Sequence, residues 1–312
     1  MSVEATGAPL RVSELGLIRG ERVILSNINF VLDHSEILGV VSNRIEPVNY
    51  LFRILLLLEN PSSGSIVYFN NPLIKRRELI KKIGFYSCQM DLLESSTVLE
   101  NLLLLASMHG LKKEKALTRA KEIMSLFEAS NLASVKWSRL PVSLKRKLCF
   151  ASAFIHDPEV ILLYDPFRGV PFDVATFMRN FIRTSIDLGK SMIIFSTTPL
   201  LLDETCDRII VLHNGQQAAI DNVDSFVTGV GGPGTLSIHV SNFNIEANID
   251  SLEKMDVSWY ATGENEAIIE LDNTPEKVPR LLEFLVKKGA IVNRIVSSRQ
   301  HLLESANRFM EV

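Results

Sequence analysis

An apolar run that enters a short polar stretch and leaves into an amphipathic run restricts the fold of this chain more than any other feature. The apolar run is residues 37–41, and the amphipathic run is residues 51–58. A continuous apolar run of this length is typical of a strand buried on both faces of a parallel sheet, and the amphipathic run indicates a helix. Strand, loop and helix in this order form a phosphate-binding loop, so residues 42–50 are the first candidate site.

This loop lacks the residues that hold a phosphate in a working loop, G-x-x-x-x-G-K-[ST]. There, glycines turn backbone N–H groups toward the phosphates, the Lys reaches the β- and γ-phosphates, and the hydroxyl holds Mg²⁺. In this register Ser42 and Pro47 replace the glycines, Val48 replaces the Lys and Asn49 replaces the hydroxyl residue. Pro47 offers no N–H, Val48 carries no charge, and an Asn amide is a poor substitute for the hydroxyl on Mg²⁺.

The degenerate loop comprises Ser42, Asn43, Arg44, Pro47, Val48 and Asn49. Losing three charge-assisted contacts of about 1.5–3 kcal/mol each weakens binding by about 10³–10⁶-fold if the losses add. We therefore expect no tight ATP site and no cofactor bound by this chain.

Composition excludes several classes of protein. The 312 residues are 46% hydrophobic and 22% charged, enough for one large and one small domain without disulfides. Cys88, Cys149 and Cys206 are far apart and odd in number, which predicts reduced thiols and no metal site. The net charge of −3 does not indicate the basic surface that nucleic-acid binding requires. No signal peptide or membrane-spanning run is visible, so we expect an intracellular chain.

The pattern along residues 1–228 predicts a doubly wound α/β domain. Residues 10–37 are expected to form short strands with turns, residues 65–69 a strand, and residues 72–135 mainly helices. The apolar runs 160–163 and 192–195 predict two buried parallel strands, joined by a helix over 173–188. A further strand is expected at 208–212.

Residues 229–234 contain four glycines and a proline, which predicts a linker to a second domain at 235–312. Beyond it we expect strands at 236–240, 257–261, 267–271 and 290–296, and helices at 245–254 and 275–288. Thr274, Pro275 and Gly289 supply the cap, the first helical residue and the stop of the second helix. This order is a split β-α-β domain, with a closing helix expected at 299–310.

Over residues 10–225 the chain resembles the ATP-binding subunits of ATP-binding cassette (ABC) transporters, especially those of ABC-2 exporters. The order and spacing of five segments carry the resemblance: NPSSGSIVYFNN (60–71), IGFYSCQMDL (83–92), LPVSLKRKL (140–148), HDPEVILLYDP (156–166) and TCDRIIVLHNG (205–215). The resemblance implies a P-loop NTPase-like nucleotide-binding domain, to which the small C-terminal α+β domain is added.

Positions that contact nucleotide in this family hold other residues here. The glutamine of the Q-loop falls on Cys88, with Gln89 one residue late. In the signature L-S-G-G-Q, the Ser and the two glycines fall on Pro141, Val142 and Ser143. That loop still predicts a helix start, and Ser143 is expected to cap it.

The Walker B strand and the switch have also changed. The metal-associated Asp falls on Tyr164, the catalytic Glu on Asp165, and the switch His on Thr198. Pro171 replaces the final Asp of the S-G-L-D segment. The aromatic residue that stacks on adenine falls on Arg19, which we interpret as an exposed loop residue.

The resemblance and these losses together predict a catalytically inactive subunit, a pseudo-ATPase, with no catalytic residue and no metal. ATP and Mg²⁺ are then expected in a partner, an active ABC ATPase subunit, with both docked on a transmembrane permease at the inner face of a membrane. Family sites are shared between two chains, so this chain would weaken both sites of a pair. Two alternatives stay open: a scaffold or regulator outside transport, and an ATPase that uses Arg44 in place of the missing Lys.

Overall fold

The computed structural model describes residues 7–42, 44–197, 201–223, 235–263, 265–272 and 277–298. They form two compact units, one up to Asp221 and one from Asn222 onward. The predicted linker at 229–234 and the predicted closing helix at 299–310 lie outside the described residues. No helix among the described residues combines the length and apolar character needed to cross a membrane.

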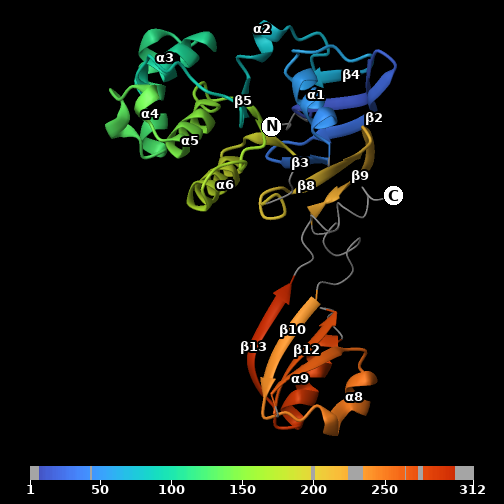
Figure 1. Ribbon diagram of the computed structural model, residues 1–312. Coiled ribbons are helices and arrows are strands. Elements are labelled where there is room, and N and C mark those ends of the chain that lie inside the picture. The colour runs from blue at the N-terminus through green and yellow to red at the C-terminus, as the bar shows by residue number, and fades with distance from the viewer. Residues whose placement is uncertain are drawn as a thin grey trace, which may run out of the picture. The chain divides into compact units, whose positions relative to one another are not determined.

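The first unit is built on a nine-stranded mixed sheet in the order β4-β1-β2-β9-β8-β3-β7-β6-β5 (Figure 1). The strands are β1 (Leu10–Arg19), β2 (Arg22–Leu32), β3 (Ile37–Ser42), β4 (Ser63–Tyr68), β5 (Ile83–Ser87), β6 (Val160–Tyr164), β7 (Ser191–Ser196), β8 (Arg208–His213) and β9 (Gln216–Asn222). Strands β8, β3, β7, β6 and β5 lie side by side in this order and run parallel to one another. Every residue of β3, β6 and β7 is buried, which confirms the double-sided burial predicted from their apolar runs.

The other edge of this sheet is antiparallel. Strands β1 and β2 form a long hairpin through Gly20, whose φ of 60° suits the tight turn. Strand β4 pairs with the outer side of β1. The short strands predicted for residues 10–37 are therefore two long ones, because cross-strand pairing on both sides of β1 extends them.

Helices surround the parallel strands, with α3, α4 and α5 gathered away from the β1–β2 hairpin (Figure 1). The helices are α1 (Ile45–Leu55), α2 (Arg76–Leu79), α3 (Val98–Met108), α4 (Lys113–Leu126), α5 (Val142–Ser152) and α6 (Phe172–Asp187), with 3₁₀ turns at Ser130–Leu132 and Trp137–Arg139. Thr97 and Glu100 form a complete capping box at the start of α3. Three aromatic rings pack together between α4, α5 and α6: the ring centroids of Phe127, Phe150 and Phe181 are 4.7–6.1 Å apart.

Two predictions for this unit were wrong in detail. The helix after the degenerate loop begins at Ile45 instead of residue 51 and ends at Leu55. Pro is tolerated in the first turn of a helix, so Pro47 does not delay its start. The stretch 72–135 also contains a strand, β5, which pairs with β6 at the edge of the parallel sheet.

The second unit has the predicted split β-α-β order. Its elements are β10 (Thr235–Ser241), a 3₁₀ turn (Glu246–Asn248), α8 (Ile249–Glu253), β11 (Ser258–Gly263), β12 (Glu266–Asp272), α9 (Lys277–Lys287) and β13 (Ile291–Ser298). The antiparallel sheet has the order β11-β12-β10-β13. Gly289, with a φ of 75°, follows the end of α9, which confirms the predicted end of this helix. Thr274 and Pro275, predicted at its start, lie outside the described residues.

A stacked pair of histidines joins α3 to the segment before β6. The rings of His109 and His156 are parallel, with centroids 3.7 Å apart. Their ring nitrogens donate to the carbonyl oxygens of Ile80 and Ile83, at 2.5 and 3.0 Å. Burial lowers the pKa of both imidazoles, and the neighbouring His109 helps to lower the pKa of His156 to about 3. Both rings are therefore neutral at pH 7.

We expect this pair to make the fold sensitive to acid. In the unfolded chain His156 is protonated below pH ~6.5, whereas in the folded chain it stays neutral until about pH 3. Stability is thus fully present above pH ~6.5 and falls by about 1 kcal/mol per pH unit for this group as the pH drops. In urea unfolding at pH 6.5, 5.5 and 4.5, His156→Gln should flatten the decline, whereas His34→Gln, at an exposed site, should not. Equal slopes for both variants would contradict the assignment.

Candidate functional site

The parallel register brings the ends of four strands together at one edge of the sheet. Val41 lies opposite Ser196, and Tyr164 lies between Phe195 and Ser87. The loops that follow β3, β5, β6 and β7 therefore begin side by side, at the carboxyl edge where open α/β sheets bind ligands. Predicted site residues from three separate segments, around Ser42, Cys88 and Asp165, meet at this edge.

Asp165 is held entirely by its own chain. Its side chain is buried, and its backbone has a φ of 46° directly after β6. The Ser196 hydroxyl donates to Oδ1 at 2.7 Å, and the Thr197 N–H donates to the same oxygen at 3.2 Å. Arg168 forms an ion pair with Oδ2 at 3.4 Å. Both carboxylate oxygens thus have donors within the chain, and the two side chains that provide them, Arg168 and Ser196, are partners that the sequence analysis missed.

Tyr164 belongs to an aromatic layer between the sheet and α1. Its ring centroid lies 5.4 Å from that of Phe52, and Phe52 lies 5.4 Å from Phe195. Burial raises the pKa of the Tyr164 hydroxyl, and a hydrogen bond with the Asn49 side chain opposes that rise. Two predicted site residues, Tyr164 and Asn49, therefore bond to each other.

The degenerate loop is short and enters α1 at once. Arg44 is the N-cap residue, and its N–H donates to the buried Ser42 hydroxyl at 3.2 Å. Pro47 and Val48 are both buried in the first turn and a half of α1. The Val48 side chain is 0% exposed and belongs to the main apolar core. Asn43 lies outside the described residues.

A hollow of about 380 Å³ lies along α1, and charged pairs surround it. It is lined by Ile45, Glu46, Asn49, Tyr50, Arg53 and Glu59. Arg19, at the end of β1, contacts Glu59 and lies over the Tyr50 ring, 5.8 Å from its centroid. Arg22 contacts Glu46 at 2.8 Å. Arg19 is thus exposed, as predicted, but it ends β1 and pairs with Glu59 of the same chain.

Cys88 and Gln89 diverge after β5. The Cys88 N–H donates to the Tyr164 carbonyl at 3.0 Å, and burial beside Asp165 raises the pKa of its thiol. Gln89 is exposed and lines a second hollow of about 240 Å³ with Met90, Asp91, Val142, Lys145 and Arg146. The structure therefore brings the predicted Q-loop residue Gln89 next to the predicted signature residue Val142. Along with Cys149 and Cys206, Cys88 is a free thiol, as predicted, and all three thiols are buried.

The signature segment forms the start of α5, but not as predicted. Pro141 is the N-cap residue, and no side chain caps this helix. Ser143 lies inside the first turn, so the expectation that Ser143 caps the helix was wrong. Pro pre-sets φ near −65° and leaves the cap position without a side-chain acceptor. Thr198, the predicted switch position, lies outside the described residues.

Three helices of this unit begin with exposed apolar residues, which the sequence analysis did not single out. Ile45, Val142 and Phe172 are the first residues of α1, α5 and α6 and are 57%, 65% and 79% exposed. Helix N-termini attract anions, but large apolar side chains at these positions obstruct the approach of a phosphate. The sequence did contain a signal for them: each is the apolar residue directly after Arg44, Pro141 or Pro171, the residues that precede the three helices.

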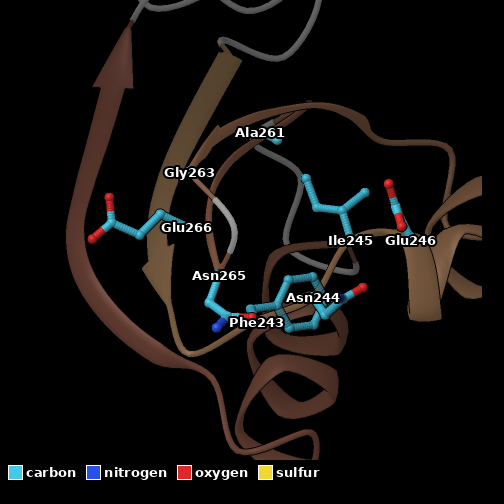
Figure 2. Close-up of a pocket in the computed structure, with 8 residues that line it drawn as sticks. All are labelled: Phe243, Asn244, Ile245, Glu246, Ala261, Gly263, Asn265 and Glu266. Atoms are coloured by element: carbon cyan, nitrogen blue, oxygen red, sulfur yellow. The ribbon is translucent and has the colours of Figure 1, made fainter.

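A further hollow, of about 430 Å³, lies in the second unit and was not predicted (Figure 2). Its lining comes from the segment after β10 and from the β11–β12 hairpin. The Asn244 side chain accepts a hydrogen bond from the Ala247 N–H at 2.9 Å, so it holds its own loop. In Figure 2, the Glu246 and Glu266 side chains point away from each other. These polar groups do not converge on a common point.

Comparison with known proteins agrees with this architecture. Residues 49–168 match the family model described as ABC transporter. Nod factor export ATP-binding protein I of Burkholderia lata is 26% identical over 202 residues, covering 64% of this chain and 66% of that protein. Methionine import ATP-binding protein MetN of Francisella tularensis subsp. holarctica is 27% identical over 202 residues, covering 63% and 58%. The chain therefore spans less than two thirds of the length of either relative.

Solved structures share the fold of the first unit. The ATP-binding subunit of an ABC transporter superposes with a TM-score of 0.64 at 19% identity, covering 72% of this chain and 93% of that one. A nucleotide-free ATP-binding cassette from an ABC transporter gives 0.61 at 18% identity, covering 69% and 91%. The fold is thus that of P-loop NTPase cassettes. The chain is thus similar to ABC transporter ATP-binding proteins in sequence and in fold. Its relatives include an export and an import protein, so the exporter type stays a prediction.

The burial of Val48 makes a charge at this position costly. We expect Val48→Lys to lower the melting temperature strongly, because an ammonium placed in an apolar core loses several kcal/mol of hydration. Val142→Lys is the matched control, since Val142 is 65% exposed and its change should stay within about 0.5 kcal/mol. Thermal unfolding by circular dichroism measures both variants. Equal melting temperatures would show that Val48 is not in the core.

The carboxylate of Asp165 should matter for stability. Asp165→Asn removes the charge that pairs with Arg168 and disturbs the bonds from Ser196 and Thr197, which should cost about 1–3 kcal/mol. Asp187→Asn changes an exposed carboxylate and is expected to be nearly neutral. Urea unfolding at pH 7 gives both values. If Asp165→Asn leaves the free energy of unfolding unchanged, these contacts do not hold the segment after β6.

Proposed function

We propose that this chain is a pseudo-ATPase subunit of an ABC-type membrane transporter, which pairs with an active ATPase subunit and docks on a permease. The match of residues 49–168 to the ABC transporter family model, and the similarity to a Nod factor export ATP-binding protein, support the transporter setting. The single observation that carries the inactivity is the burial of Val48, at the position of the phosphate-binding Lys. Because Val48 is enclosed in the apolar core, a side chain at this position cannot reach a phosphate unless the core opens.

The residues at the site do not fit Mg²⁺-ATP. Val48 supplies no charge, Pro47 supplies no N–H, and the Asn49 side chain bonds to Tyr164. The Asp165 carboxylate lies directly after β6, and its oxygens already accept from Ser196, Thr197 and Arg168. A metal would have to displace these donors before it could bind.

The hollow along α1 is equally unsuited to a triphosphate. Glu46 and Glu59 contribute carboxylates to its lining, which repel phosphate oxygens. The nearby cations Arg19, Arg22 and Arg53 are already paired with these carboxylates, at up to 3.8 Å. The alternative ATPase that relies on Arg44 is less well supported, because a single exposed Arg does not replace the backbone cradle that glycines provide.

The exposed apolar residues at the helix starts support contact with a protein partner. Ile45, Val142 and Phe172 expose side chains that lose unfavourable contact with water when another protein covers them. If the partner is an active cassette, its composite ATP site is completed by the segment Pro141–Ser143, which has no glycine N–H groups to offer. Hydrolysis in such a pair should be slow. In the alternative arrangement, two active subunits pair and this chain lies elsewhere in the complex.

Nucleotide binding is the direct test. Isothermal titration of the purified chain with Mg²⁺-ATP should give no saturable binding below about 1 mM, because the missing contacts are worth roughly three or more orders of magnitude. Steady-state phosphate release should equal the buffer blank. Arg44→Ala should change neither measurement if Arg44 contacts no phosphate. Micromolar affinity or steady turnover would reject the proposal.

The partners need a separate experiment. Affinity purification of the tagged chain from its native membrane should recover a permease and an intact cassette ATPase. Phe172→Glu should reduce recovery of the ATPase if the helix starts form the contact, whereas Leu188→Glu, at another exposed apolar site, is the control. Recovery of other proteins in place of a permease would favour the scaffold alternative.

A further inference from the structure

In the four-stranded sheet of the second unit, described helices cover one face, and no described element covers the other, which we call the open face. Leu236, Ile238 and Ile269 point to the covered face and form a buried cluster with Leu252 of α8 and Leu281 of α9. Both described helices thus pack on the same side of the strands (Figure 1). The alternate residues of each strand lie on the other face, because side chains alternate along a strand.

Strand register defines what the open face presents. Its middle row runs across all four strands as Tyr260, Ile268, His239 and Arg294, each directly opposite the next. Tyr260 is 50% exposed, and Arg294 is also exposed. The row therefore has an aromatic ring at one edge of the sheet and a guanidinium at the other.

The rows on either side carry acid beside hydroxyl groups. Glu270 lies opposite Ser237, whose hydroxyl contacts the carboxylate at 3.2 Å. Glu266 lies opposite Ser241. In both rows the carboxylate is on β12 and the hydroxyl is on β10, the two central strands. The open face as a whole mixes acidic, basic, polar and apolar groups.

We propose that this open face binds the same face of a second copy of the chain, about a two-fold axis parallel to the strands. Such an axis reverses the order of each row. Tyr260 then faces the partner's Arg294, which allows a cation–π contact at each end of the row. Ile268 faces the partner's His239, and no charged side chain faces one of like sign.

The same axis matches the outer rows. The carboxylate of Glu270 faces the hydroxyl of the partner's Ser237, and the carboxylate of Glu266 faces the hydroxyl of the partner's Ser241. A nucleic acid would meet these carboxylates with its phosphates, so it fits this face less well. Self-complementarity under one rotation is the property that an isologous dimer contact requires.

The size of the face sets the strength of the contact. Four strands about 4.8 Å apart and three rows about 7 Å apart give roughly 400 Å² per copy, or about 800 Å² in total. Stable interfaces bury about 1,200–2,000 Å², so we expect dimers only at protein concentrations on the order of 100 µM. This association is independent of the proposed pseudo-ATPase role, which concerns the first unit.

Sedimentation equilibrium of the full chain from about 5 to 500 µM tests the proposal. The wild type should pass from monomer to dimer. Tyr260→Arg or Arg294→Tyr alone should weaken association by about 5- to 30-fold, because each removes two symmetry-related contacts. The double variant Tyr260→Arg/Arg294→Tyr should restore it, since the exchanged side chains again meet across the axis.

Arg280→Glu is the control, because Arg280 is exposed on α9, which packs on the covered face. It should leave the dimerisation constant unchanged. Circular dichroism of each variant shows whether the second unit is still folded. A wild type that stays monomeric at 500 µM would overturn the proposal. A dimer that the single variants leave intact, or that the double variant fails to restore, would also overturn it.

Discussion

Helix α1 is held on the parallel sheet by apolar contacts in which Val48, Leu51 and Phe52 take part. The Phe52 ring makes a tilted contact with Tyr164 of β6 and an edge-to-face contact with Phe195 of β7, so one ring links the helix to two central strands. Truncating such a ring costs about 3–5 kcal/mol in a packed core. The position of the loop before α1, and the closeness of Asn49 to Tyr164, both depend on this packing. The contacts that stabilise the first unit therefore pass through the site where a family member would hold nucleotide.

The architecture of both units could be predicted because each depends on local patterns. Continuous apolar runs identified the strands that became β6 and β7, and the alternation of strands and helices beyond residue 235 identified the split β-α-β unit. The start of α1 was missed because the motif register marked Pro47 to Asn49 as loop. The residues Val48, Leu51, Phe52 and Leu55 nevertheless have the i, i+3, i+4, i+7 spacing of a helix, and that pattern was the better guide.

The site was only partly predictable. The sequence positions Ser42, Cys88 and Asp165 do converge, because parallel strands align their ends. The partners of the Asp165 carboxylate could not be predicted from the sequence, since Ser196 ends a different strand and Arg168 reaches back across a turn. The Arg19–Glu59 pair likewise joins a hairpin to the segment after α1, 40 residues away. Such contacts depend on tertiary geometry, which no local pattern encodes.

The enclosure of Val48 also bears on how such a chain can evolve. Regaining a phosphate-binding loop would require a lysine at a position now surrounded by Leu51, Phe52 and their neighbours, and every single step toward it would first reduce stability. Selection removes variants that fall below the stability a protein needs. Under the proposed loss of nucleotide binding, a return to it would pass through less stable variants, whereas exposed residues remain free to change.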